Sequence, residues 1–522
     1  MNAADPRPKP RTPVTVAGGV ALVAVATFAL CLRNDFVYDD VHLLLMDDRI
    51  LSPSQWGRYL TESYNGGVDN LYRPLVSFTY AVQWWLHGNR PAAFFAVNVA
   101  VHAVASVLVA RLVGDWPVGL ARRLWAGLLA GLIFAVHPVH AEVVATVVGR
   151  AESMCATFFL GALLLASGPL SGRRALATWA CALGAMLSKE QGLLLPAALL
   201  VMLVAQGRAN PSRQPDRRGL VLLLMLICWS WAGYVLFREN TLKFWWDRTT
   251  LDWVQQPLVL AEGGDRWLMP VALLGRYVAL FFWPARLSLD YGGSVIGWQT
   301  HAADAFLWIG IVAVVAWAAW LAWGIRRRDA FAVVCLLSAA VTYGLSSNLL
   351  TLIGTNFAER LVYLPSAFAI ALLARALTDA LPARAAVVVV ALLSAAGATR
   401  TVAYVRHFDD RLQAYRHAVE TQPKSVRLHM LLASELVARG RLDEAAEVAR
   451  RAVETEPDYQ EPYILAAAVE LERRDPDAAE VWLRAALGLP RLKTPAKVAA
   501  YLDRVVELRA TLGEHRPATQ PR

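Results

Sequence analysis

The chain has 522 residues, of which 57% are hydrophobic and only 18% are charged, and its mean hydropathy is +0.39. These values lie outside the range of soluble globular proteins and indicate an integral membrane protein. The formal net charge of +9 could suggest a nucleic-acid partner, but the basic residues lie in short clusters between apolar runs, so we expect no nucleic acid.

The first apolar run, Val14 to Leu32, follows the basic residues Arg7, Lys9 and Arg11. At about 19 residues it is long enough to span a bilayer and longer than the core of a signal peptide, so we predict an uncleaved signal anchor. Ten further apolar runs follow it: Ala92 to Val113, Leu120 to Val136, Met154 to Ala166, Ala175 to Leu187, Leu193 to Ala205, Leu220 to Phe237, Phe306 to Trp323, Phe331 to Leu345, Leu361 to Leu377 and Ala385 to Val402. The pattern predicts an all-α, polytopic protein with about eleven transmembrane helices.

The basic clusters fall on alternate loops, as the positive-inside rule requires. The inside clusters are Arg7 to Arg11, Arg122-Arg123, Arg173-Arg174, Arg208 through Arg218, Arg326 to Arg328, and Arg384. Counting the apolar segment Trp267 to Pro284 as a span would place the Arg326 cluster outside. We therefore predict a re-entrant or interfacial helix there, broken by Pro270 and Pro284, and leave an ordinary twelfth span as the alternative. The shorter apolar stretch Leu75 to Leu86 is also expected along the interface.

The composition changes after Val402, where charged residues at helical spacing begin. The segment Arg416 to Pro423 recurs as Arg450 to Pro457, a shift of about 34 residues, which is the tetratricopeptide period. A third copy follows at Arg484. The small residues Ala445, Ala449 and Ala452 suit close helix packing, Gly440 suits a hairpin turn, and Pro457 a helix end. We predict a membrane domain over 1–403 and an α-solenoid of about two full repeats over 404–522, docked on the membrane domain or on a partner protein.

An odd number of spans places this tail outside, together with a concentration of polar residues. Asp39 and Asp40 follow the first span directly. Two carboxylates at the boundary of lipid and water suit a base that acts on a polar acceptor. For this pair, a helix N-cap is the structural alternative. The other outside groups are His137, His140, Glu142, Arg150, Glu152, Arg73, Lys189, Glu190, Glu359 and Arg360. Ionisable groups at this boundary are costly when unpaired, so the collection indicates mutual pairing, a polar ligand, or both, in an outward-facing cavity.

These residues also stand in a distinctive order. The motifs are Tyr38-Asp39-Asp40, Tyr72-Arg73-Pro74-Leu75, His137-Pro138-Val139-His140-Ala141-Glu142, Gly149-Arg150-Ala151-Glu152, Lys189-Glu190-Gln191-Gly192, and Ala358-Glu359-Arg360-Leu361-Val362-Tyr363-Leu364-Pro365-Ser366. Followed by tetratricopeptide repeats, this succession resembles the transmembrane and tetratricopeptide repeat-containing O-mannosyltransferases. That family is similar to the wider class of GT-C type enzymes, which use a sugar on a lipid phosphate and carry a catalytic acidic pair in the first external loop. The chain departs from the family in its short repeat array, and its Ala/Arg-rich composition suggests a bacterial protein.

The resemblance implies transfer of a monosaccharide, mannose above all, from a polyprenyl phosphate to Ser or Thr hydroxyls of a protein or peptide acceptor. In a bacterium the carrier would be undecaprenyl rather than dolichyl phosphate, and the active site and repeats would face away from the cytoplasm across the inner membrane. Asp39 would be the base, and Asp40 would orient a substrate or contact a metal. Arg73, Arg150, Lys189 and Arg360 are the candidates for the donor phosphate, with only one or two expected to touch it.

The remaining groups are expected to support this pocket: His137, His140, Glu142, Glu152, Glu190 and Glu359. A divalent cation is possible in such a site, but His137, His140 and Glu142 lack the spacing of a helical metal motif, which favours a hydrogen-bonded role for the histidines. Two other functions stay open on the sequence alone. One is a polysaccharide polymerase or ligase with a diphosphate-linked oligosaccharide donor, and the other is a non-catalytic membrane scaffold that displays the repeats.

Overall fold

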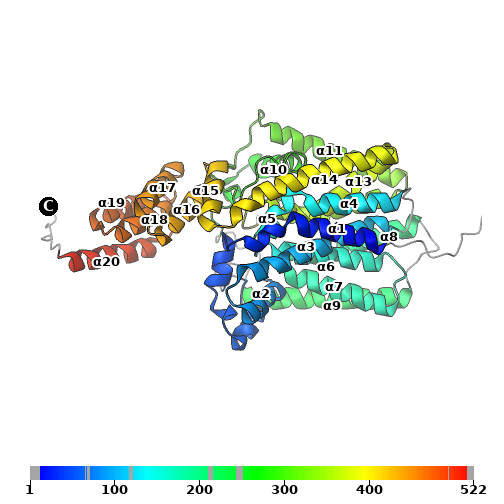
Figure 1. The fold of residues 1–522 in the computed structure, drawn as a ribbon, viewed down its shortest axis with the longest axis horizontal. Helices are drawn as coiled ribbons and strands as arrows, with labels where there is room; N and C mark the ends of the chain where they lie inside the picture. Colours follow the sequence, from blue (N-terminus) through cyan, green and yellow to red (C-terminus); the bar gives the residue numbers. More distant parts are fainter. Residues whose placement is uncertain are drawn as a thin grey trace, which may run out of the picture.

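The computed structural model describes residues 12–64, 66, 71–116, 122–209, 216–242, 251–491 and 493–513. Arg7, Lys9 and Arg11 and part of the Arg208 to Arg218 cluster lie outside these ranges. The described residues form helices, turns and loops without a strand. Figure 1 shows a large helical bundle and, at one end of it, a smaller set of helices that carries the C-terminus. The all-α architecture expected from the apolar runs is therefore confirmed.

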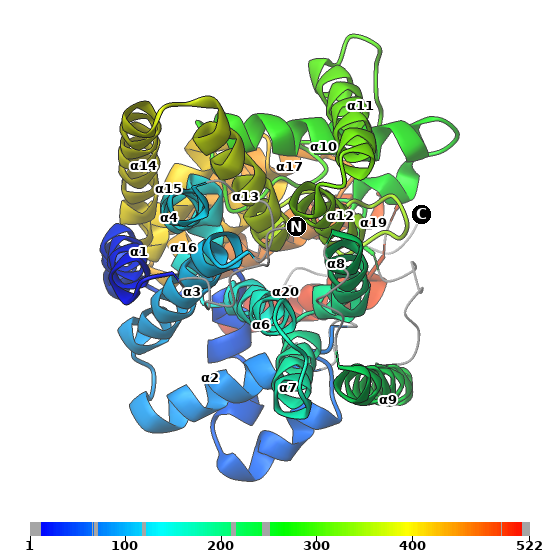
Figure 2. The same ribbon diagram turned by 90° about the vertical axis from the view of Figure 1, so that its right-hand side faces the viewer.

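Each of the eleven predicted apolar runs corresponds to a helix. The first run, Val14 to Leu32, extends beyond the end of its helix at Thr27, and Leu120 and Ala121 of the third run lie outside the described residues. The corresponding helices are α1 (Val14–Thr27), α3 (Pro91–Gly114), α4 (Arg123–Val136), α6 (Arg150–Ala166), α7 (Gly172–Ser188), α8 (Leu195–Ala209), α9 (Arg217–Leu242), α11 (Ala305–Arg326), α12 (Ala330–Gly344), α13 (Tyr363–Ala380) and α14 (Ala383–Val405). Figure 2 views several of them along their axes, including α1, α4, α7, α9 and α14, so they run side by side as membrane helices do.

The described residues contain 6 helices that are long and apolar enough to cross a membrane, or up to 7 if one bent pair forms a single span. The bent pair joins α4 to the segment Pro138–Ala145 at 52°. This segment contains the short helix α5 (Ala141–Ala145). The bend separates the apolar body of α4 from the polar residues at its outer end. It therefore turns Glu142 toward the interior of the bundle instead of continuing along the axis of α4.

Two helices lie across the bundle axis in Figure 2, namely α2 (Pro74–His87) and α10 (Asp265–Phe282). Both correspond to segments predicted at the interface, and both expose aromatic residues, such as Trp85 and Trp267. Helix α10 packs closely on α11, because a Cβ on Gly275 would lie 1.8 Å from the Phe306 carbonyl oxygen. The predicted break at Pro270 is wrong. Pro270 lies near the start of α10, where it removes only the hydrogen bond to the carbonyl of Arg266, and the helix runs on to Phe282.

The chain leaves α14 at Val405 and enters the repeat domain, which we define as α15 to α20. Its helices are α15 (Arg411–Thr421), α16 (Val426–Ala438), α17 (Leu442–Thr455), α18 (Gln460–Glu472), α19 (Pro476–Leu487) and α20 (Pro495–Leu512). Successive helices pack as antiparallel hairpins, with Gly440 at φ +70° in the turn between α16 and α17. Ala445, Ala449 and Ala452 are fully buried. The C-terminal α-solenoid that the repeat period predicts is therefore present.

Candidate active site

The candidate active site lies where the repeat domain meets the bundle. The chain that follows α1 passes beneath the repeat domain, because the Asp35 N–H donates to the Phe408 carbonyl at 3.0 Å and Arg411 donates to the Phe36 carbonyl at 2.8 Å. Asp39 and Asp40 follow directly on this segment. The repeat domain and the acidic pair therefore lie at the same end of the bundle, as the odd number of predicted spans requires.

Asp40 is completely buried, and its carboxylate accepts the backbone N–H groups of Val147 at 3.0 Å and Val148 at 2.8 Å. Asp40 was predicted to contact a substrate or metal, but the structure encloses its side chain completely, so no substrate or metal reaches it in this arrangement. The N-cap alternative is also wrong, since Asp40 makes no side-chain bond to the turn that follows it. Burial raises the pKa of Asp40 to about 7, although the backbone N–H groups of Val147 and Val148 oppose that shift.

Asp39 points elsewhere and remains accessible, with 30% of its side chain exposed. Its Oδ1 accepts a hydrogen bond from Arg427 Nη2 at 3.1 Å, and its Oδ2 lies 3.7 Å from Arg360 Nη2. The two neighbouring acids thus have separate environments. Both lie at the start of a helical turn, where the side chains of adjacent residues point about 100° apart around the axis. Asp39 is the carboxylate of the pair that a substrate can reach.

Arg360 links Asp39 to buried acids of the bundle. Its guanidinium Nη1 donates to Glu142 Oε1 at 2.6 Å, and its backbone N–H donates to Glu142 Oε2 at 2.8 Å. The Nε atom lies 4.0 Å from Glu152 Oε1, which also accepts Lys189 Nζ at 2.6 Å. Glu142, Glu152 and Lys189 are nearly inaccessible, whereas 18% of the Arg360 side chain is exposed. The predicted pairing among these motifs is present, and Arg360 is its accessible member.

Arg150 does not join this network, and its predicted contact with the donor phosphate is contradicted. Its side chain is fully buried and donates to the oxygens of Asn98 at 2.8 Å, Thr79 at 3.2 Å and Phe94 at 2.9 Å. The guanidinium also lies 4.8 Å from the ring centre of Tyr80. These neutral partners accept one hydrogen bond from each of the three guanidinium nitrogens, and complete burial closes the side chain to a ligand. Arg150 therefore holds α2, α3 and α6 together.

Arg73 and Lys189, the other two phosphate candidates, are each paired with an acid. Arg73 Nη2 donates to Glu190 Oε2 at 3.0 Å, and its guanidinium lies 5.1 Å from the ring centre of Tyr64. Lys189 is taken by Glu152, as described above. The Lys189 pair is nearly inaccessible, and 10% of the Arg73 side chain is exposed. Arg360 is also paired, but it is the most exposed of these cations and the one that faces Asp39, which makes it the first candidate among the four.

The remaining predicted residues have internal hydrogen bonds. His140 bonds the Phe134 carbonyl and the Ser366 hydroxyl, each at 2.8 Å, and His137 Nδ1 accepts the Val139 N–H at 3.3 Å. Glu359 Oε1 accepts the Tyr291 hydroxyl at 2.6 Å and the Ser288 N–H at 2.8 Å. The described ranges hold no group of three or more His, Cys, Asp or Glu residues placed to bind a metal ion. The histidines have the hydrogen-bonded role that their spacing favours.

Three residues near Asp39 escaped the sequence analysis: Arg427, Asp290 and Ser425. Asp290 accepts the Tyr38 hydroxyl at 3.2 Å and the Ser425 hydroxyl at 2.7 Å. Arg427 and Ser425 belong to the repeat domain, where charged surface residues are ordinary. One signal in the sequence could have identified Arg427. A shift of about 34 residues aligns it with Glu461, so the first repeat carries a basic residue where the next repeat carries an acidic one. Asp290 follows α10 in a loop without any motif that distinguishes it.

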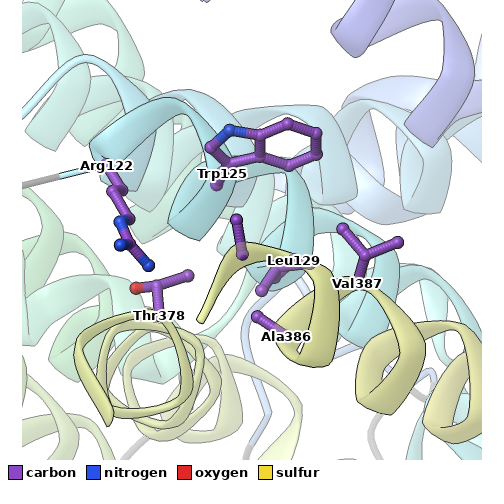
Figure 3. Close-up of a pocket in the computed structure, with 7 residues that line it drawn as sticks. Arg122, Trp125, Leu129, Thr378, Ala386 and Val387 are labelled. Carbon is purple, nitrogen blue, oxygen red and sulfur yellow. The ribbon is translucent and has the colours of Figure 1, made fainter. Parts of the chain in front are cut away.

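A small cavity lies at the end of the bundle opposite to the repeat domain, where α4 and α14 begin. Figure 3 shows Trp125 and Leu129 of α4 beside Thr378 of α13 and Ala386 and Val387 of α14. The space holds about 10 Å³, and Arg122 at its rim donates to the Leu381 carbonyl at 3.0 Å. Such a volume is about that of one water-sized sphere. It therefore offers no alternative site for a sugar or a lipid phosphate.

One family model matches part of the repeat domain. The family described as tetratricopeptide repeat matches residues 426–469, which cover α16, α17 and most of α18. Among solved structures, ArnT from Cupriavidus metallidurans bound to undecaprenyl phosphate is 16% identical, with 95% of this chain and 88% of that chain covered and a TM-score of 0.42.

Curated relatives cover a larger share of the chain than the repeat family does. The protein O-mannosyl-transferase F38B6.6 of Caenorhabditis elegans is 27% identical over 367 residues, which are 66% of this chain and 49% of the relative. The protein O-mannosyl-transferase TMTC4 of Homo sapiens is 28% identical over 66% of this chain and 53% of the relative. The protein O-mannosyl-transferase TMTC1 of Mus musculus is 36% identical over 170 residues, which are 30% of this chain and 18% of the relative. The chain spans about half the length of the first two relatives. In sequence, the chain is therefore similar to the transmembrane and tetratricopeptide repeat-containing O-mannosyltransferases, as the order of its motifs predicts.

Proposed function

We propose that the chain is a membrane glycosyltransferase that moves one monosaccharide, mannose in the first instance, from a polyprenyl phosphate to a Ser or Thr hydroxyl of a protein acceptor. The observation that carries the proposal is the environment of Asp39. This carboxylate is accessible, stands between two arginines, and lies at the end of a membrane bundle beside a protein-binding repeat fold. The naming of its relatives as protein O-mannosyl-transferases supports the same activity.

The reaction assigns one task to each accessible group. A bond forms between the acceptor oxygen and the anomeric carbon of the sugar, while the bond between that carbon and the phosphate oxygen breaks. The acceptor hydroxyl gives its proton to Asp39, which acts as the general base. The products are the O-glycoside and the free polyprenyl phosphate, which keeps the bonding electrons as negative charge.

Arg360 is the cation best placed to stabilise that charge. The Nη1 atom of its guanidinium donates to Glu142, and the Nη2 atom faces Asp39. An arginine fork matches the oxygens of a phosphate, and an orientation fixed in advance loses little entropy in the transition state. Lys189 and Glu152 stand behind Arg360 and keep the buried charges balanced.

The acceptor and the repeats would share one side of the membrane. Because the repeat domain touches the Asp39 loop, a protein bound by the repeats would lie next to the base. Basic clusters on the predicted inner loops support an extracytoplasmic site, which in a bacterium means the periplasmic face of the inner membrane. Undecaprenyl phosphate is then the carrier that we propose.

The test uses the full chain purified in detergent with labelled polyprenyl-phosphate-mannose and a panel of Ser/Thr peptides, with and without chelator. We expect labelled peptide, and we expect Asp39→Asn to abolish transfer without lowering the melting temperature. Asp458→Asn, an exposed acid of the repeat domain, serves as the matched control and should transfer normally.

Transfer only from a diphosphate-linked oligosaccharide would replace this proposal with a polymerase or ligase. Absence of transfer with every donor, together with repeats that still bind protein, would favour the non-catalytic scaffold. A loss of transfer in chelator that Mg²⁺ or Mn²⁺ restores would establish a need for a divalent cation.

A further inference from the structure

We propose that the repeat domain is part of the active site: its residue Arg427 is a positioning residue that fixes Asp39 and leaves one carboxylate oxygen free to receive the proton of the acceptor. This inference rests on the proposed function and adds to it. The repeat domain would then control the chemical step directly, in addition to any binding of an acceptor protein.

The two oxygens of Asp39 face two different domains. Oδ1 accepts a hydrogen bond from Arg427 Nη2 at 3.1 Å, and Arg427 belongs to the first turn of α16. Oδ2 faces Arg360 of the bundle at 3.7 Å, a separation that exceeds a hydrogen bond between nitrogen and oxygen. Arg427 thus occupies one oxygen, while Oδ2 keeps lone pairs for a hydroxyl and remains near a cation. We assign Oδ2 as the atom that accepts the proton.

The backbone before Asp39 also depends on the repeat domain. Tyr38 has φ of 57°, which is an uncommon and strained conformation for a bulky residue. Its N–H donates to the Tyr415 hydroxyl at 2.9 Å, and its ring lies 4.4 Å from the Arg427 guanidinium. Tyr415 and Arg427 both come from repeat helices. The strained peptide that aims Asp39 is therefore held by side chains that the membrane domain does not supply.

A third contact completes the connection. The Tyr38 hydroxyl donates to Asp290 Oδ1 at 3.2 Å, and Ser425 of the repeat domain donates to Asp290 Oδ2 at 2.7 Å. Tyr38 and Asp290 are buried, so these bonds form away from water and stay directional. Tyr415, Ser425 and Arg427 together surround the Tyr38 to Asp39 peptide. Movement of the repeat domain away from the bundle would release all three contacts at once.

The experiment compares Arg427→Gln, Arg427→Lys and the wild-type full-length chain, with Arg450→Gln as a matched control. Arg450 is an exposed arginine of α17 that pairs with Glu447 on its own helix. We expect Arg427→Gln to lower kcat about 10- to 100-fold, because a misplaced catalytic group can lose about a hundredfold in rate. KM for the donor should not change, since the donor phosphate is assigned to Arg360 and Arg427 is assigned to Asp39. Arg427→Lys should recover part of kcat, and Arg450→Gln should match the wild type.

A second measurement does not require enzymatic turnover. Hydrogen exchange followed by mass spectrometry should show faster exchange of residues 36–42 in Arg427→Gln, with α17 and α18 unchanged. Ser425→Ala should give a smaller increase in the same segment. If Arg427→Gln does not fold, Arg427→Lys and Ser425→Ala decide the question by the same two measurements.

The outcomes separate the two proposals. If the wild type transfers no sugar from any donor, the proposed function fails, and hydrogen exchange alone judges the coupling between the domains. Unchanged exchange of residues 36–42 in the variants, or a kcat of Arg427→Gln equal to that of the wild type, would overturn the role of Arg427. A rise in donor KM with an unchanged kcat would also overturn it, because that result would make Arg427 a donor-binding residue.

Discussion

Arg360 donates twice to Glu142: its backbone N–H reaches Oε2 at 2.8 Å, and its guanidinium reaches Oε1 at 2.6 Å. The two donors come from one residue, so the Glu142 carboxylate fixes both the backbone and the side chain of Arg360. Glu142 is almost completely buried on α5, and Arg360 lies in the turn before α13. This pair therefore ties the bent end of α4 to the helix that begins at Tyr363.

The first prediction concerns Glu142→Ala, which removes the acid and leaves Arg360 partly buried without its main partner. Breaking such a pair costs about 3–5 kcal/mol when both members are buried, and the partial exposure of Arg360 favours the lower end. We expect a clear fall in the melting temperature in detergent and a loss of transfer. Glu447→Ala, at an exposed pair of α17, should melt within about 1 °C of the wild type, since surface pairs contribute about 0–1 kcal/mol. Equal melting of Glu142→Ala and the wild type would contradict the argument.

Arg150→Lys gives the second prediction, and it separates a structural role from contact with the donor. Lysine keeps the charge but cannot reproduce the planar set of donors that meets Asn98, Thr79 and Phe94. We expect destabilisation of about 1–3 kcal/mol and an unchanged donor KM in the protein that folds. Thermal melting and steady-state kinetics on the same preparation provide the two readings. A stable Arg150→Lys with weakened donor binding would restore the assignment made from the motif.

Much of the fold could be predicted from sequence because hydrophobic length and the repeat period are local signals. Every predicted apolar run corresponds to a helix, and Gly440 and the alanines of α17 have the places that the repeat pattern gives them. The transverse course of α10 could be predicted from charge on the neighbouring loops. If α10 crossed the membrane, the Arg326 cluster would lie on the outside, against the positive-inside rule. The course of α10 through Pro270 was missed because the effect of a proline depends on its distance from the helix start.

The candidate site was harder to predict, because a motif identifies polar residues without showing which of them are buried. Asp39 and Asp40 are adjacent, yet one is accessible and the other is completely enclosed. The same applies to Arg150 and Arg360, which both stand in motifs of the family and have opposite environments. Arg427 could not be found from a motif, since its role arises from a contact across 388 positions. Only the docking of the two domains brings it to Asp39.

The third prediction concerns the buried pair of Glu152 and Lys189, which are joined at 2.6 Å. Glu152→Gln or Lys189→Met alone leaves one buried charge without its partner, so each single variant should be strongly destabilised. The double variant should lose less than the sum of the two, by about 2 kcal/mol, because removing both charges also removes their desolvation penalty. Melting curves of the four proteins in one detergent measure this coupling. Additive effects would mean that Glu152 and Lys189 do not form an ion pair in solution.

The last prediction follows from the burial of Asp40, which raises its pKa from the usual 3.8 to about 7. Because the folded protein holds this proton more tightly than the unfolded chain does, the stabilisation is complete below about pH 4. It is lost as the pH rises through 7. A shift of this size corresponds to roughly 4 kcal/mol over the window. We therefore expect the melting temperature of the wild type, relative to that of Asp40→Asn, to fall between pH 4.5 and 7.5 and to level off above that range.

Asp40→Asn is the informative partner in this comparison, because it cannot ionise and keeps one oxygen that accepts the N–H of Val147 or Val148. The side-chain NH2 group of the asparagine faces the other backbone N–H, which is left without an acceptor. The variant should therefore be less stable than the wild type at pH 5. Differential scanning fluorimetry across the pH series measures both effects, and subtracting the two curves removes the titration of every other group. A difference that rises with pH would show that the bonds to Val147 and Val148 outweigh burial, so that Asp40 is ionised in the folded protein throughout this range.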